Sequence, residues 1–153
     1  MQTNSSNPEK QESTSGLLSG IFQTSSLSNF LAEHEASLQL PTLSEYLNAL
    51  CQTKGVERFE VVKRAGIERS FGFQIFQGTK SPSRDKVIQL AIGFGMGLEE
   101  AQALIKLSQK SALYPRVKRD AAIIYCLNRH LDFTDTQAVL AGMKLAILGS
   151  ERD

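Results

Sequence analysis

The sequence has no tryptophan, two histidines and two cysteines among its 153 residues. His34 and His130 are too few and too far apart to hold a metal ion, and we expect neither a metal site nor a cofactor. Cys51 and Cys126 form no CxxC motif, and both lie among apolar residues with helical spacing. Buried free thiols are therefore predicted in preference to a disulfide.

Long apolar runs are also missing, and no secretory leader is expected. No stretch approaches the ~18 apolar residues that a membrane-spanning helix needs. The start, MQTNSSNPEKQESTSG, has neither the basic nor the apolar region of a secretory signal. We therefore expect a cytoplasmic protein with no membrane partner.

Charge is nearly balanced over the whole chain, with 17 basic and 16 acidic residues, but it is unevenly distributed. Residues 1–40 hold one lysine against four glutamates, a net charge of −3. Residues 54–86 hold eight basic against four acidic side chains, and residues 110–129 hold five against one, so each range carries +4. An acidic tail beside a basic body can bind or shield the basic face, although solvated helices also carry such charge.

Five parts are predicted along the chain. They are a disordered tail (1–26), a short helix and linker (27–40), a helical domain (41–96), a C-terminal helical extension (97–148) and a short tail (149–153). The tail contains an apolar island, Leu17 to Phe22, which is either a short docking peptide or a chance cluster. No stretch alternates with the period of a strand, and no internal repeat is evident.

Helix boundaries are marked clearly from residue 42 onward. The markers are Thr42 with Glu45 as a capping box, Gly55, Arg58, Gly66, Arg69, Gly78, Ser83, Glu99 with Glu100, Pro115, and a second capping box from Thr134 to Gln137. Apolar residues recur between them at helical spacing. The predicted fold class is all-α, a bundle of four to five helices extended by a C-terminal subdomain of two to three helices.

Five landmarks over residues 42–92 occur in a characteristic order. A first amphipathic helix ends in Lys54-Gly55, a short second helix leads to Gly66, a third leads to Gly78, a Thr79–Ser83 loop follows with the form Gly-x-x-x-Pro-Ser, and a fourth helix closes the bundle. This third of the chain resembles the lambda-repressor-like helix-turn-helix domain of the Cro/XRE family. The resemblance implies a bacterial or phage transcriptional regulator that reads the major groove of double-stranded DNA with the helix 69–77.

The same resemblance assigns the site residues. Base-edge contacts are expected from Arg69, Ser70, Phe73 and Gln74, and phosphate contacts from Arg58, Gln77, Thr79, Lys80 and Arg84. Arginine pairs bidentately with guanine and glutamine with adenine, each worth ~1–3 kcal/mol of discrimination. A possible second basic patch comprises Arg116, Lys118 and Arg119.

The sequence departs from the family pattern at two positions. The family usually has a small residue at the position of Val62 and a branched one at the position of Gly72, so the sizes are exchanged here. If the two residues meet where the second and third helices cross, Val62 fills the volume that Gly72 leaves. Phe76 is predicted in the core, whereas Phe71 and Phe73 are equally compatible with the core and with an exposed face.

Two other functions stay open. The protein could be an accessory or adaptor subunit, such as an antitoxin or a member of a retron-type defence cassette, that holds a partner protein, a structured nucleic acid or a second copy of itself. An enzyme is disfavoured: Cys126 and His130 are four residues apart, but no orienting carboxylate or oxyanion hole follows in a recognisable order. We therefore assign no catalytic residue and no small-molecule substrate, and we expect Asp132 or Asp135 to cap a helix.

Overall fold

Residues 12–150 are described in a computed structural model of the chain, and residues 1–11 and 151–153 lie outside that range. Within residues 12–150 all regular structure is helical, which confirms the all-α fold class. The chain divides into two compact units, residues 1–40 and 41–153.

The N-terminal unit contains helices α1 (Thr14–Gln23) and α2 (Leu27–Glu33), and the 3-10 helix Glu35–Leu38. The predicted disordered tail is therefore wrong for Thr14–Gln23, while its first eleven residues lie outside the described range. Two features explain the helix, one local and one a packing contact. The Ser13 hydroxyl caps its first turn by accepting from the Gly16 amide, and Phe30 is buried against Gly20.

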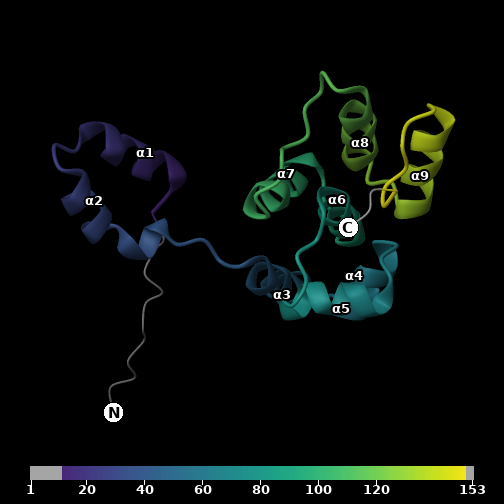
Figure 1. The fold of residues 1–153 in the computed structure, drawn as a ribbon, viewed down its shortest axis with the longest axis horizontal. Coiled ribbons are helices and arrows are strands. Elements are labelled where there is room, and N and C mark those ends of the chain that lie inside the picture. The colour runs from purple at the N-terminus through teal and green to yellow at the C-terminus, as the bar shows by residue number, and fades with distance from the viewer. Residues whose placement is uncertain (1–11, 151–153) are drawn as a thin grey trace, which may run out of the picture. The chain divides into compact units, whose positions relative to one another are not determined.

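The second unit contains seven helices within the described residues. They are α3 (Leu43–Lys54), α4 (Arg58–Arg64), α5 (Arg69–Gln77), α6 (Arg84–Gly93), α7 (Leu98–Leu107), α8 (Lys118–Asn128) and α9 (Phe133–Gly142). Figure 1 shows α6 in the middle of this unit, with α3, α4 and α5 on one side and α7, α8 and α9 on the other. Helix α6 packs against α4, α7 and α9, and is buried along most of its length.

Most helix ends lie where the sequence places them. The Thr42 and Ser83 hydroxyls accept from the amides of the residues three positions later, and Gly55 and Gly78 end their helices with φ of 63° and 81°. The second capping box is wrong. Asp132, not Thr134, caps α9, by accepting from the Asp135 amide at 2.8 Å.

One hydrophobic core runs from Leu47 in α3 to Leu148 after α9, so it includes residues from both predicted helical ranges, 41–96 and 97–148. The last helix also reaches the turn between α4 and α5. A Cβ on Gly66, whose φ is 66°, would lie 2.3 Å from the Phe133 ring. Gly66 therefore serves both the left-handed turn and the close packing of α9.

The structure contains an internal repeat that the sequence analysis did not find. Residues 84–113 (repeat A) and 119–148 (repeat B) correspond at an offset of 35 positions, so that α6 and α7 match α8 and α9. The residues identical in the two repeats are Arg84/Arg119, Asp85/Asp120, Ile88/Ile123, Gln102/Gln137, Ala103/Ala138 and Leu113/Leu148. So few identities explain why the repeat is not evident from the sequence.

Backbone geometry and hydrogen bonds establish the repeat. In repeat A the Gln102 side chain accepts from the Leu113 amide and donates to its carbonyl oxygen, both at 2.8 Å. In repeat B Gln137 does the same with Leu148, at 2.8 and 2.9 Å. Left-handed backbone recurs at the same offset, since Gln109 and Lys144 both have a φ of 58°.

Candidate nucleic-acid interface

Helices α4 and α5 cross at the pair of residues whose sizes are exchanged. A Cβ on Gly72 would lie 2.4 Å from Cγ1 and 2.7 Å from Cγ2 of Val62. Both residues are buried, so neither position has free space. This confirms the prediction that Val62 fills the volume left by Gly72, and it explains how a glycine is accommodated in the middle of α5.

The outward face of α5 carries the predicted contact residues. Gly72, Ile75 and Phe76 are buried and Phe71 packs against the core, which confirms the core prediction for Phe76. The residues on the opposite side are half-buried or exposed, and they are Arg69, Ser70, Phe73, Gln74 and Gln77. Their spacing of i, i+1, i+4, i+5 and i+8 forms one continuous stripe along the helix.

Arg69 is held at the start of this stripe by two aromatic rings. Its guanidinium carbon lies 5.5 Å from the ring centre of Phe59 in α4 and 5.6 Å from that of Phe73 in α5. Phe59 is 46% exposed, so these contacts form at the surface. Stacking on ring faces leaves the edge of a guanidinium free to donate hydrogen bonds, and it restricts the side chain before any ligand binds.

Glu68 is a site residue that the sequence analysis missed. Its carboxylate caps α5 by accepting from the Ser70 amide at 3.0 Å and from the Phe71 amide at 2.9 Å. The hydrogen bond from the Phe71 amide, and then that from Ser70, lower the pKa of Glu68. The amides that would otherwise attract a phosphate at this helix end are therefore occupied. An acidic residue directly before a predicted helix was the available signal.

Other cations surround the stripe. Arg58 at the start of α4 and Lys80 in the loop after α5 are exposed, and their phosphate contacts stay predictions. Lys80 and Gln77 line a hollow of about 450 Å³ between that loop and the first turn of α3. Thr79 is also exposed, with its hydroxyl donating to the Gln74 carbonyl oxygen at 3.2 Å. Lys63, at the end of α4, is a further exposed cation that the resemblance did not assign.

The side chain of Arg84 is bound within the protein, which argues against the predicted phosphate contact. Its guanidinium donates to both carboxylate oxygens of Asp120 at 3.0 and 2.9 Å, and to the carbonyl oxygens of Ser111 and Ala112 at 2.8 and 3.2 Å. Four of its five N–H donors act within these bonds. The physical reason is the repeat, which brings the start of α8 to the start of α6.

Arg119 makes the equivalent bonds from repeat B. It donates to both oxygens of Asp85 at 2.9 and 2.8 Å and to the carbonyl oxygens of Ala146 and Ile147. The two repeats thus exchange arginine–aspartate pairs, as expected for elements related by a two-fold axis. Arg119 is consequently a structural residue, and only Arg116 and Lys118 of the predicted second patch are exposed.

Asp120 is almost completely buried within this exchange. Burial alone raises the pKa of its carboxyl. Hydrogen bonds from Arg84 and the Tyr114 amide, together with the charges of Arg84 and Arg119, outweigh that effect, so the net pKa is lowered. The Asp120 carboxylate is therefore ionised at neutral pH, and its hydrogen bonds to Arg84 join α8 to α6.

The two cysteines and His130 form no reactive cluster within the described residues. Cys51 and Cys126 are buried free thiols, as predicted, and burial raises the pKa of each. His130 lies outside α8 in a left-handed conformation, with its ring Nδ1 3.1 Å from the Gly95 carbonyl oxygen. In residues 12–150 no cluster of three metal-ligating side chains occurs. None of the helices in this range has the length and apolar character to cross a membrane.

Comparisons with protein-family models, with curated proteins and with solved structures give no match.

Proposed function

We propose that this protein is a sequence-specific DNA-binding regulator of the bacterial or phage type, in which α4 and α5 act as a helix-turn-helix. The observation that carries the proposal is the outward stripe of α5, which begins with Arg69 and continues through Gln74. Side chains on the first turns of such a helix reach base edges in the major groove. Arg58 and Lys80 flank the stripe at positions suited to the DNA backbone.

The stacked arginine supports base reading over phosphate binding. Because Phe59 and Phe73 restrict Arg69 in advance, less rotamer entropy is lost when it pairs with a guanine. Glu68 at the same helix end repels a phosphate close to the Ser70 and Phe71 amides. Backbone contacts therefore fall to the exposed cations of α4 and of the loop after α5.

The test is selection from random duplex and random single-stranded oligonucleotide pools, followed by sequencing of the retained strands. We expect a short duplex motif. Arg69→Ala should relax the preference at one position by ~1–3 kcal/mol. Lys80→Ala should weaken all duplexes alike and reduce the salt slope by about 0.9.

Arg84→Lys is not a suitable control because Arg84 holds the fold together. Lys110→Ala is suitable, since Lys110 is exposed beyond α7, and it should leave both readouts unchanged. Equal losses on selected and random duplexes for Arg69→Ala would refute base reading by α5.

An adaptor function is the second candidate, and one observation favours it. The stripe includes an aromatic side chain, Phe73, next to the half-exposed Phe59, where a protein partner could pack. Retention of no strand from any pool would favour this function. The decisive measurement would then be a stable complex that Phe59→Ala dissolves, formed with a protein encoded beside this one.

A further inference from the structure

The two repeats differ in how their equivalent faces are covered. In repeat A, Val87 and Leu90 of α6 and Leu104 of α7 are completely buried. Lys54, the last residue of α3, forms a 2.9 Å ion pair with Glu100 in α7. The three buried residues belong to the hydrophobic core that also includes Leu47 and Cys51 of α3.

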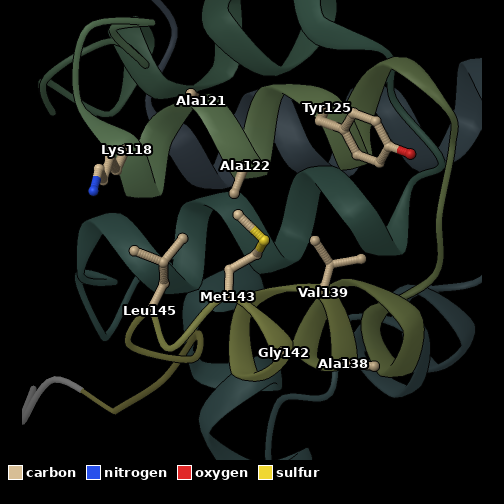
Figure 2. A pocket seen from close by; sticks show the side chains of 9 residues that line it. All are labelled: Lys118, Ala121, Ala122, Tyr125, Ala138, Val139, Gly142, Met143 and Leu145. Atoms are coloured by element: carbon tan, nitrogen blue, oxygen red, sulfur yellow. The ribbon is translucent and has the colours of Figure 1, made fainter.

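In repeat B the equivalent face is open. The counterparts of Val87, Leu90 and Leu104 are Ala122, Tyr125 and Val139, and Tyr125 is 48% exposed. A groove of about 700 Å³ lies between α8 and α9 at this place. Figure 2 shows Met143 and Val139 directed from α9 toward α8, with Ala122 facing them.

The shape of the groove suits a helix. Its lining includes small residues, among them Ala121, Ala138 and Gly142, which allow close approach of a backbone. The lining also includes larger apolar side chains, among them Tyr125, Met143 and Leu145. Met143 and Tyr125, which both line the groove, are 66% and 48% exposed, so apolar exposure is grouped at this place.

The charges of the groove select the kind of helix. Lys118 lines one end, and at the other end Arg129 lies over the Tyr125 ring, 3.7 Å from its centre. The two are about 16 Å apart along α8. The groove lining, as described, includes no carboxylate; Arg129 lies beyond the lining, as does the exposed Asp135 in the first turn of α9. A second copy of the chain would bring the same basic ends together, which is unfavourable.

We propose that the groove between α8 and α9 binds an amphipathic helix of a partner protein, one with an apolar stripe of about three turns and acidic residues near its ends. The helix would cover, on repeat B, the apolar positions that are buried in the core on repeat A. Binding of this type uses anchors at i, i+3 or i+4, and i+7. This surface belongs to α8 and α9 and is independent of the α5 stripe in the proposed DNA contact.

The test is selection of helical peptides by the purified full-length chain from a displayed library, randomised at both apolar and charged positions. We expect enrichment of an apolar stripe with acidic flanks. Synthetic copies should bind at micromolar Kd, and Met143→Glu should weaken them at least tenfold. Met143 is largely exposed, so this variant should keep the thermal stability of the wild type.

Two further variants separate charge from folding. Lys118→Glu should shift the selected flanks from acidic to basic, whereas Lys144→Glu, an exposed charge outside the groove, should leave the selection unchanged. The proposal would be overturned if the selected peptides bind Met143→Glu as tightly as the wild type. It would also be overturned if the wild type selects peptides with basic flanks, or if no peptide is enriched. If the protein self-associates and Met143→Glu abolishes this, the groove binds a second copy of the chain. If Lys118→Glu abolishes nucleic-acid binding, the groove binds a polyanion. Either result would also overturn the proposal.

Discussion

The contact between Gly72 and Val62 allows a quantitative test of how α4 and α5 pack. Gly72→Ala in an ordinary helix interior would stabilise the fold by ~1 kcal/mol. Here the new methyl group would lie 2.4 Å from a buried Val62 methyl carbon. Overpacking of this kind costs ~1–3 kcal/mol. We therefore expect a net destabilisation of about 1 kcal/mol, opposite in sign to the helix propensity.

Val62→Ala should destabilise the fold by a different route. It removes two buried methyl groups at about 0.8 kcal/mol each and leaves a cavity, for a total of roughly 2–3 kcal/mol. In the double variant the methyl group added at position 72 enters that cavity without a clash, and alanine is more favourable than glycine in a helix. We therefore expect a stability within about 1 kcal/mol of the wild type, and a coupling energy of at least ~2 kcal/mol.

The assay is urea unfolding of the full chain, followed by circular dichroism, for the wild type, both single variants and the double variant. Gly142→Ala is the control, because a Cβ at this helix position would have nothing within 4 Å. It should stabilise the fold by up to ~1 kcal/mol. If the effects of Gly72→Ala and Val62→Ala add to within ~0.5 kcal/mol, the two side chains do not compete for one volume and the packing argument is refuted.

Two other predictions concern ionisation. Because the folded pKa of Asp120 lies below its unfolded value, its contribution to stability is present above about pH 4 and is lost as the pH falls through the folded pKa. The free energy of unfolding of Asp120→Asn should be about 3–5 kcal/mol lower than that of the wild type at pH 7, the cost of a broken buried pair. This difference should become smaller below about pH 4. A difference that is constant with pH would contradict the prediction. The thiols of Cys51 and Cys126 should react with a disulfide reagent roughly a hundredfold more slowly in the native protein than in urea. Rapid labelling of Cys126 in the native state, assigned with Cys126→Ser, would show that its burial is incomplete.

Local signals predicted the helices that carry the candidate interface. Helix α5 begins at Arg69 and ends at Gln77, as expected from the glycines on either side of it. These signals are short in range: a cap or a left-handed glycine acts within one turn of the helix that it ends. The N-terminal helix α1 was not predicted because its stability depends on a longer contact, the packing of Phe30 against Gly20.

The roles of the arginines depend on contacts with residues far away in the sequence. Arg69 and Arg84 both begin helices and look equivalent in the sequence, yet one is stacked at the surface and the other is bound to Asp120, 36 residues away. Charge and local position do not distinguish them, because the distinction lies in which distant carboxylate the fold brings near. The same holds for Arg119 and Asp85.

By itself, the sequence determined the helical class, the positions of most helix ends and the outward stripe of α5, because these follow from the period of apolar residues and from side chains that bond to nearby backbone. It also indicated the Gly72–Val62 exchange, because an unusual pair of sizes is visible before any contact is known. Only the tertiary structure decided the internal repeat, the exchanged arginine–aspartate pairs and the open groove of repeat B. The arginine–aspartate pairs join residues 34 and 36 positions apart, and the groove and the repeat depend on helices that meet only when the core forms.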